Sequence, residues 1–269
     1  MLQKFEESDS VLNRELFMAD EVQYNLIHRI CESQSSTCLK SSDETLIYAQ
    51  SEGNNPWLWI SKEAASETKI ALLQALLDEL DGTSLPGICG EPATAESFAQ
   101  LYSEVRHTQY HRNMMMEAYY CPKVKKPLDI KGTVQQAKRH HVETVAAFLA
   151  GFSEGAYGAA VDPASLIPEA EGMIETGNLY LWIADQLPVS MANISHRSPR
   201  HGRINAVYTP SACRKRGYAS ALAAALCSIL ESEGFVPMLY ADAKNPDSNK
   251  VYQNIGFIES GKIVDITFK

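Results

Sequence analysis

The chain has 269 residues, 45% of them hydrophobic and 21% charged, a composition typical of globular proteins that excludes a disordered or fibrous chain. Its formal net charge is −9, from 24 basic and 33 acidic residues, which argues against nucleic acid or anionic lipid as a partner. The positive charge is nevertheless concentrated. Residues 186–230 contain no Asp or Glu, and their basic residues are Arg197, Arg200, Arg203, Arg214, Lys215 and Arg216.

The N-terminal residues show no cationic region followed by an apolar run, so no signal or transit peptide is expected there. No window approaches the roughly 18 consecutive apolar residues that a membrane-spanning helix needs. The six cysteines are scattered and form no CxxC pair, which favours reduced thiols over a disulfide framework. We therefore expect a cytoplasmic protein.

The first half is predicted to alternate strands with helices, because short β-rich runs separate segments with apolar residues at helical spacing. The expected elements are strands at 46–49 and 57–60, a helix with Ile70, Leu73, Leu77 and Leu80 on one face, a strand near 85–89, a helix containing Ala95, Phe98 and Leu101, and a strand near 114–120.

A linker is predicted at Pro122–Pro127, where two prolines enclose three lysines. It divides the chain into an N-terminal α/β domain at 1–121, the linker at 122–127, and a second domain at 128–269. The second domain begins with a helix marked by Val142, Val145, Ala146, Leu149 and Phe152, followed by a glycine-rich segment at 151–158 that ends or bends it.

The rest of the second domain is predicted as an α/β alternation around a mixed sheet. The expected elements are strands at 179–184, 189–194 and 204–208, a helix at 217–233 stopped by Gly234, a strand at 236–241, a short helix at 246–254, and a final strand at 263–268. The first half shows the same order in weaker form, which is open to two interpretations: a duplicated fold, or the pattern of any α/β domain.

The turn at 207–219 lies between a strand and a long helix. A helix N-terminus presents unpaired backbone N–H groups and partial positive charge, and Gly217 lets a ligand approach the backbone closely. The turn therefore predicts a phosphate or pyrophosphate site. ATP and NAD are disfavoured, because neither GxxxxGK[ST] nor GxGxxG occurs. The corresponding turn of the first half, Ser61–Ser66, has no glycine and one cation, so no such site is expected there.

Two motifs resemble the GNAT superfamily of N-acetyltransferases. Arg214-x-x-Gly217-x-Ala219 is similar to its acyl-CoA pyrophosphate signature, and the segment from Asn245 to Phe257 resembles its second motif, in the expected order and context. The resemblance covers about residues 128–269. It implies a GNAT-like acyl-CoA N-acyltransferase fold, an α/β mixed sheet, with an N-terminal α/β domain that can be interpreted as a degenerate copy.

The resemblance also implies which residues bind acetyl-CoA. Strand backbone would pair with the pantetheine arm, the turn amides would hold the pyrophosphate, and a downstream asparagine would bond the cofactor arm. The implied cofactor-binding residues are Val207, Tyr208, Thr209, Arg214, Lys215, Arg216, Gly217, Tyr218, Ala219, Ser220, Asn245, Asn249 and Tyr252. No metal is expected.

Tyr252 falls where the family usually keeps a tyrosine near the thioester sulfur, so the resemblance makes it the catalytic general acid for the leaving thiolate. Tyrosine, with a pKa near ~10, is protonated at neutral pH and can donate. The alternative is that Tyr252 only packs. The carboxylate that many members place on the preceding strand is replaced here by Arg203, so the base stays open between ordered water, His196 and His201; histidines in a polar loop are more often solvated than catalytic.

Three other features offer candidate functional residues. His107 and His111 would lie one turn apart on a helix and could hold a metal, but without further ligands they are interpreted as surface residues. Cys213 lies among cations at a helix start, where packing is favoured over a nucleophilic role. The segment 151–174, with Glu154, Asp162, Glu169 and Glu171, is a candidate wall of the acceptor site or a plain surface loop.

The sequence therefore predicts an enzyme that transfers an acetyl group from acetyl-CoA to a primary amine through a tetrahedral intermediate. One alternative is an amino-acid N-acyltransferase of the glycine type that uses other acyl-CoAs. Another is an acyl-CoA-binding regulatory module without turnover. The expected partners are acetyl-CoA and an amine acceptor, a small molecule being favoured over a protein; nucleic acid and membrane are not expected, and the protein is expected to be a monomer or homodimer.

Overall fold

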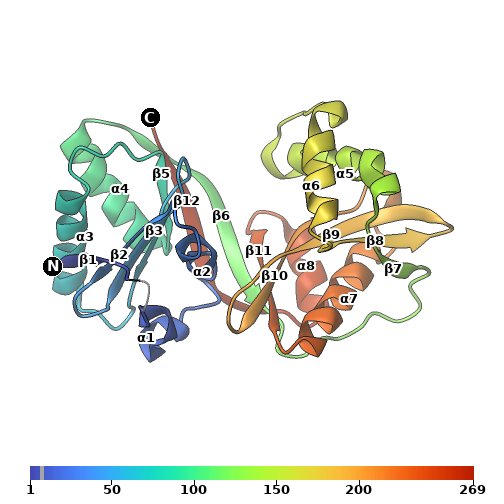
Figure 1. Ribbon diagram of the computed structural model, residues 1–269, viewed down its shortest axis with the longest axis horizontal. Helices are drawn as coiled ribbons and strands as arrows, with labels where there is room; N and C mark the ends of the chain where they lie inside the picture. The colour runs from blue at the N-terminus through green and yellow to red at the C-terminus, as the bar shows by residue number, and fades with distance from the viewer. Residues whose placement is uncertain (7–8) are drawn as a thin grey trace. The chain divides into compact units, whose positions relative to one another are not determined.

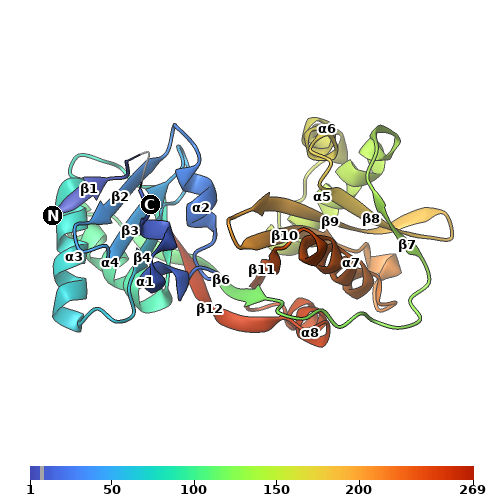
Figure 2. The same ribbon diagram turned by 60° about the horizontal axis from the view of Figure 1, so that its bottom comes forward.

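The computed structural model describes residues 1–6 and 9–269 and divides into two compact units (Figures 1 and 2). The first unit combines Met1–Ala118 with Glu259–Lys269, and the second is Tyr119–Ile258. These units differ from the predicted domains, because the last strand was predicted to belong to the second domain at 128–269 and instead lies in the first unit. No helix of the described residues has the length and apolar character needed to cross a membrane.

The first unit contains a mixed sheet of strand order β1-β2-β3-β4-β5-β12. Its neighbours pair antiparallel except β4 and β5, which run parallel. The strands are β1 (Leu2–Lys4), β2 (Thr37–Ser41), β3 (Leu46–Gln50), β4 (Trp57–Ile60), β5 (Gly87–Gly90) and β12 (Ile258–Phe268); β6 (Tyr110–Tyr120) follows α4.

Helices α3 (Ser66–Glu79) and α4 (Pro92–Arg106) pack on one side of this sheet through a shared apolar core. Glu91 caps α4 by accepting the N–H of Thr94, and Pro92 occupies the first turn, as proline prefers. Tryptophans of β4 contact instead the segment that holds η1 (Val11–Asn13), α1 (Glu15–Met18) and α2 (Leu26–Cys31). This segment and β2 have no strong periodicity and were not predicted.

The last strand of the chain is built into the first unit. Residues 264–267 of β12 pair antiparallel with β5. The Gln23 side chain donates to the carbonyl oxygen of Lys262 at 2.7 Å, and Asp265 accepts from Asn55 at 2.6 Å. By contrast, β6, the strand that follows α4, belongs to this unit only as far as Ala118. The N-terminal half therefore takes a strand from the C-terminal end of the chain.

The second unit contains the strand order β11-β10-β9-β8-β7. Neighbours are antiparallel except β10 and β11, which are parallel. Its elements are β7 (Thr133–Gln136), η2 (Arg139–His141), α5 (Val142–Tyr157), η3 (Pro163–Leu166), α6 (Ile167–Glu175), β8 (Leu179–Ala184), β9 (Leu187–Arg197), β10 (His201–Tyr208), η4 (Ser211–Cys213), α7 (Tyr218–Ser232), β11 (Val236–Asp242) and α8 (Pro246–Asn254).

Two apolar cores fix the faces of this sheet. One core joins Ile204, Val207 and Leu239 to α7 and α8, and the other joins Ala206 and Tyr208 to α5 and α6. Figure 1 shows α5 and α6 on one side of the strands and α7 on the other. Because side chains alternate along a strand, these contacts assign each residue of β10 and β11 to a face.

The segment predicted as a linker, 122–127, lacks regular structure but packs within the second unit. The N–H of Val124 donates to Glu231, and the N–H of Lys125 donates to the carbonyl oxygen of Ile255. The glycine-rich segment predicted to end or bend α5 ends it at Gly158, where φ is +67°. Gly151 lies inside the helix.

The order strand, helix, parallel strand, helix occurs in both units. In the first it is β4, α3, β5 and α4, and in the second it is β10, α7, β11 and α8. The predicted difference between the two turns is also visible, because the first turn of α3 carries Glu67 whereas that of α7 carries no acid. A carboxylate at a helix start opposes an anionic ligand.

Candidate functional site

β10 and β11 pair only over their first residues. The register joins 201–203 to 236–238, whereas β10 continues to Tyr208 and β11 to Asp242. Beyond residue 203 the two strands are not hydrogen-bonded to each other. An extended ligand can therefore insert between them and bond to strand backbone, as peptides do at open sheet edges.

A bulge lies in β10 just before the predicted site. Asn205 pairs with Asn193 and Tyr208 with Met191, so three steps along β10 match two along β9. Ala206 has φ +49°, a left-handed conformation that is uncommon outside glycine. Bulges re-aim neighbouring groups and are frequent beside active sites. No residue type marked this bulge in the sequence, because the strained residue is alanine.

The turn after β10 places a bare helix N-terminus at the predicted pyrophosphate position. Gly217 is the N-cap of α7 with φ +80°, and Lys215 has φ +62°. No side chain caps this end, and the first intrahelical bond is from Ala221 to Gly217. The amides of Tyr218, Ala219 and Ser220 thus precede the first bond of the helix and supply the donors that an anion needs.

Gly217 is required chiefly by its φ of +80°, and its surroundings add one close contact. A methyl group at this position would lie 2.5 Å from Cδ1 of Ile130, a residue of the segment that precedes β7. Ile130 therefore lies against the turn, and it packs on the same apolar core as α7. This support was not predicted, because Ile130 lies 87 positions earlier in the sequence.

The cationic side chains of the turn are exposed, but they are not equivalent. The Nε–H of Arg214 donates to the carbonyl oxygen of Thr209 at 3.0 Å, so this side chain closes the turn onto the end of the strand. The hydroxyl of Thr209 lies 2.9 Å from that of Ser190 on β9. Lys215 and Arg216 are exposed and extend the positive charge of the turn.

Tyr208 faces away from α7. Its ring packs on Phe148 of α5, with ring centres 5.8 Å apart, and its hydroxyl lies where a side chain on Gly151 would be. Only the backbone of Tyr208 can therefore belong to the predicted cofactor site. Gly151 connects this end of β10 to the segment 151–174 proposed as an acceptor wall.

The second motif positions two asparagines differently. Asn245 is the N-cap of α8, and its Oδ1 accepts the N–H of Ser248 at 3.0 Å, so its side chain has a structural role. Asn249 donates through Nδ2 to the carbonyl oxygen of Asp242, at the end of β11. The Oδ1 of Asn249 is buried without a hydrogen-bond partner among the described residues. Such an acceptor fits a donor group of the pantetheine arm, because buried polar atoms are normally satisfied.

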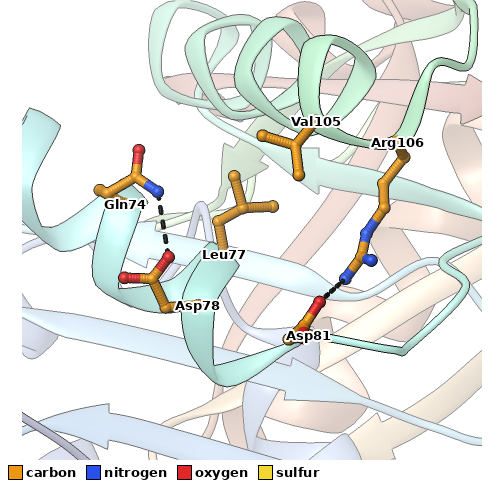
Figure 3. A pocket seen from close by; sticks show the side chains of 6 residues that line it. All are labelled: Gln74, Leu77, Asp78, Asp81, Val105 and Arg106. Carbon is orange, nitrogen blue, oxygen red and sulfur yellow. Dashed lines mark hydrogen bonds and ion pairs between the residues drawn. The ribbon is translucent and has the colours of Figure 1, made fainter.

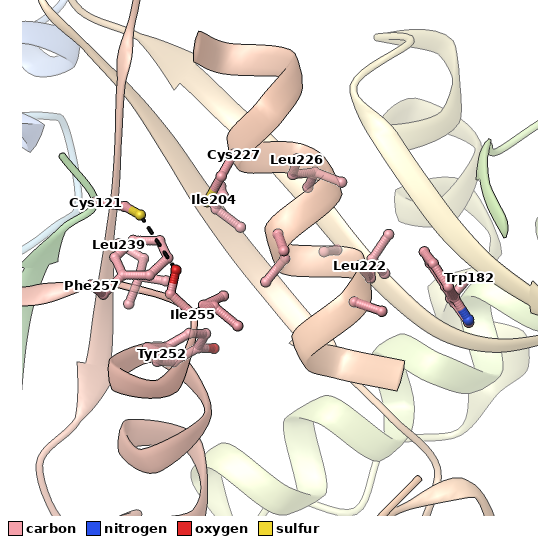
Figure 4. Close-up of a cluster of buried hydrophobic side chains, with 14 of the residues drawn as sticks. Cys121, Trp182, Ile204, Leu222, Leu226, Cys227, Leu239, Tyr252, Ile255 and Phe257 are labelled. Carbon is pink, nitrogen blue, oxygen red and sulfur yellow. Dashed lines mark hydrogen bonds between the residues drawn. The ribbon is translucent and has the colours of Figure 1, made fainter. Parts of the chain in front are cut away.

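Tyr252 lies on α8 and is 7% exposed. Its ring contacts those of Tyr119 and Phe257, and Figure 4 shows its hydroxyl directed from α8 toward α7. Burial raises the pKa of Tyr252 above its usual value, which keeps the phenol protonated. Tyr252 therefore packs in the core and also carries a protonated hydroxyl, so its geometry is compatible with both the packing role and the general-acid role.

The expectation that His196 and His201 lie solvated in a polar loop is wrong. Both belong to strands and are buried, at 7% and 9% exposure. His201 begins β10 and His196, on β9, pairs with Arg203, so both lie away from the turn at the end of β10. The Arg203 side chain is on the face opposite α7, where its Nε–H donates to Ser195 at 2.9 Å and its guanidinium carbon lies 5.9 Å from the centre of the Tyr240 ring.

The remaining candidates do not gather at this site. His107 ends α4 with φ +53° and His111 lies on β6, so they are not on one helix. Among the described residues no group of three or more His, Cys, Asp or Glu side chains could hold a metal. Cys213 packs against the core around α7.

A pocket in the first unit lies between α3 and α4, lined by Leu77, Val105 and polar residues (Figure 3). Arg106 there pairs with Asp81 at 3.0 Å and donates to the carbonyl oxygen of Leu80. None of the predicted site residues lies in this pocket. The chemistry that the motifs predict is instead at the open strand pair of the second unit.

Comparisons with known proteins agree with the motifs. Residues 180–264 match the model of the FR47-like protein family, which spans both motifs. A search of curated proteins found no match. A Drosophila protein has a TM-score of 0.67 at 12% identity, covering 100% of this chain and 98% of that one.

Two further solved structures are named acetyltransferases. A GNAT-family acetyltransferase from Colwellia psychrerythraea has a TM-score of 0.59 at 12% identity and covers 100% of both chains. A GCN5-related N-acetyltransferase from Sphaerobacter thermophilus has a TM-score of 0.58 at 12% identity, covering 100% and 95%. The chain has the GNAT fold, and the resemblance inferred from its two motifs is confirmed.

Proposed function

We propose that this protein is an acyl-CoA-dependent N-acetyltransferase whose site is formed by β10, the turn at 209–217, α7 and α8. One observation carries the proposal: two parallel strands separate beside an uncapped, acid-free helix N-terminus. The separated strands suit an extended arm with amide groups, and the helix start suits the pyrophosphate at its end. Acetyl-CoA joins these two features in one molecule.

The recognition of acetyl-CoA is assigned mainly to backbone. We assign the pyrophosphate to the amides of residues 215–220, with Lys215 and Arg216 adding charge at longer range. The backbone of Val207 to Thr209 and the unsatisfied Oδ1 of Asn249 are assigned to the pantetheine arm. The side chains of Arg214 and Asn245 bond within the protein and are assigned structural roles.

The proposed reaction is direct transfer. The neutral amine attacks the thioester carbonyl carbon, the C–S bond breaks, and the products are an acetamide and the CoA thiol. A backbone N–H near Val207, re-aimed by the bulge at Ala206, would donate to the carbonyl oxygen as negative charge develops on it. Tyr252 would give its hydroxyl proton to the departing sulfur and regain one from solvent or from the acceptor ammonium.

Two measurements test this proposal. Saturating acetyl-CoA should raise the melting temperature, and thiol release with a panel of primary amines should identify acceptors. Tyr252→Phe should keep the acetyl-CoA shift, because the ring still packs, while the rate of thiol release falls at least ~10-fold, the scale of lost general-acid catalysis. Tyr120→Phe, on β6, is a matched control that should retain the wild-type rate.

Each outcome separates the candidate roles. No shift with acetyl-CoA would refute the binding assignment. A shift without thiol release for any acceptor would favour a binding module that has lost turnover, for which the replacement of the strand carboxylate by Arg203 is the supporting observation. A full rate in Tyr252→Phe would reduce Tyr252 to a packing residue.

A further inference from the structure

Two thiols of the first unit lie in direct contact. Cys31 is the last residue of α2 and Cys38 lies on β2, and their sulfur atoms are 3.0 Å apart. Both side chains are half-buried, and residues 32–35 of the connection between them are exposed. No CxxC motif marks this pair in the sequence, because six residues separate the two cysteines. The fold therefore brings together, beside an exposed turn, two thiols that the sequence pattern leaves apart.

The backbone around the pair is fixed by hydrogen bonds. Cys38 lies in the ladder between β2 and β3, and its carbonyl oxygen accepts the N–H of Phe5 at 3.0 Å. The turn before β2 is closed by Ser36, whose N–H and hydroxyl both donate to the carbonyl oxygen of Ser33. Folding thus holds the two sulfur atoms together before any bond forms between them. Intramolecular reactions are strongly accelerated when the reacting atoms are held in this way.

A bond between the two sulfurs requires little movement. A disulfide has an S–S distance of about 2.0 Å, so sulfur atoms that are 3.0 Å apart need to approach by only about 1 Å. Cys31 ends its helix and is followed by exposed residues, whereas Cys38 is held in the sheet. The approach can therefore take place at the end of α2 while β2 stays in place.

The surroundings make the two thiols unequal. The hydrogen bond with Cys31 lowers the pKa of the Cys38 thiol. The same hydrogen bond raises the pKa of the Cys31 thiol, and burial and the carboxylates of Asp9 and Glu32 raise it further. The thiolate is the nucleophile in thiol chemistry. Cys38 is therefore the member of the pair that reacts first with an external partner, and Cys31 is the member that follows.

A second thiol pair of the chain provides a contrast. Cys121 and Cys227 in the second unit are also hydrogen-bonded to each other. They are only 1% and 0% exposed, however, so a reactant from solvent reaches them only after local unfolding. Contact between two thiols alone does not make them reactive. The pair of Cys31 and Cys38 combines contact with access.

We propose that Cys31 and Cys38 form a redox-active dithiol that exchanges with low-molecular-weight disulfides. The Cys38 sulfur attacks one sulfur of the reactant RSSR, whose S–S bond breaks, which leaves a mixed disulfide on Cys38 and releases one RS⁻. The Cys31 sulfur then attacks the Cys38 sulfur, which forms the protein disulfide and releases the second RS⁻. The two protein sulfurs are oxidised, the small disulfide is reduced, and the two thiol protons end on two molecules of RSH. This chemistry is independent of the proposed acetyl transfer.

The new bond would fasten α2 to the sheet of the first unit. The segment that leads into α2 is held by contacts between side chains and the sheet: Asp20 accepts the indole N–H of Trp59 at 3.1 Å, and Gln23 donates to the carbonyl oxygen of Lys262. A covalent link at the other end of α2 would restrict opening of this segment. We therefore expect slower amide hydrogen exchange of residues 26–31 in the oxidised protein than in the reduced protein.

The test exposes the full chain to oxidised glutathione and follows the state of each thiol. The reaction is quenched with acid, free thiols are alkylated with a maleimide in denaturant, and the protein is digested with trypsin. Cleavage after Arg29 and Lys40 places both cysteines in one peptide, 30–40. We expect this peptide to carry two maleimide groups before oxidation and none afterwards, with a mass lower by two hydrogen atoms. The closed form should exceed the glutathione adduct at least ~10-fold, because the second thiol is already in contact.

Three variants separate the roles of the thiols. Cys31→Ser keeps a hydroxyl that can donate to Cys38 but cannot close the ring, so it should stop at the glutathione adduct of Cys38. Cys38→Ser leaves only the thiol beside Asp9 and Glu32, so its adduct should form several-fold more slowly. Cys213→Ser removes a half-buried cysteine of the second unit and should close the Cys31–Cys38 bond at the wild-type rate.

The results that would overturn the proposal are distinct. A glutathione adduct that persists in wild type as it does in Cys31→Ser would refute the closing step. A peptide 30–40 that keeps both thiols in oxidised glutathione would refute the reactivity of the pair. Oxidation of Cys121 and Cys227 at the same rate would assign the reaction to unfolded chain and would refute a site made by the fold. Recovery of both thiols on addition of dithiothreitol, together with the loss of the slowed exchange at 26–31, would support the proposal.

Discussion

Gly217→Ala tests whether the start of α7 has the role assigned to it. The glycine has φ +80°, and an added methyl group would lie 2.5 Å from Cδ1 of Ile130. A non-glycine residue in the left-handed region costs about 1–2 kcal/mol. At ~2–4 °C per kcal/mol for a protein of this size, the melting temperature should fall by roughly 2–8 °C. The end of the Ile130 side chain can move away from the new methyl group, whereas relief of the strained φ requires the backbone of the turn to shift, so acetyl-CoA affinity should fall at least ~10-fold, the scale of one lost charge-assisted hydrogen bond.

The same helix offers a matched control at its other end. Gly234 follows α7 with φ +87°, and a methyl group there would meet nothing within 4 Å. Gly234→Ala should therefore show the backbone cost in melting temperature while keeping wild-type affinity for acetyl-CoA. Calorimetric titration of both variants with acetyl-CoA decides the question. Equal affinities for the two variants and wild type would refute the assignment of the pyrophosphate to this turn.

Three further predictions concern other parts of the chain. A chain ending at Ile258 should lose the cooperative unfolding of the first unit, measured by hydrogen exchange of β5, because β12 pairs there; unchanged protection of residues 87–90 would contradict the strand assignment. Asn245→Ala should lower stability by ~1 kcal/mol through loss of the α8 cap without weakening acetyl-CoA binding, and a specific loss of binding would return this side chain to the site. The hydrogen bond with Cys31 lowers the pKa of the Cys38 thiol. Because the thiolate is the reactive form, alkylation of Cys38 should reach its half-maximal rate at a lower pH in wild type than in Cys31→Ala. Identical pH profiles for the two proteins would refute the contact.

The order of elements in the second half was predictable because each is marked by local chemistry. Glycine at position 234 and proline at 246 set helix limits, and the strand at 179–184 was predicted with its observed bounds. The first turn of α7 could be inferred because its function depends on backbone and on an acid-free sequence. A site that is formed by the backbone of one short segment can be predicted from sequence, because its motif is local.

Long-range contacts were not predictable from local pattern. Ile130 supports Gly217, Gly151 makes room for Tyr208, and β12 completes the sheet of the first unit. The bulge at Ala206 depends on a pairing shift between strands and has no residue signature. The two histidines were misplaced because a short polar sequence at 195–203 is compatible with both a loop and a tight connection between two strands.

Hydrogen exchange with and without acetyl-CoA is the sharpest test of the proposed binding site, because it reports on the backbone amides to which binding is assigned. We predict protection of residues 207–220 and of α8 on addition of acetyl-CoA. The corresponding turn of the first unit, 61–66, which precedes the acid-bearing start of α3, should not change and serves as the internal reference. Protection of 61–66, or none at 207–220 under saturating acetyl-CoA, would refute the proposed site.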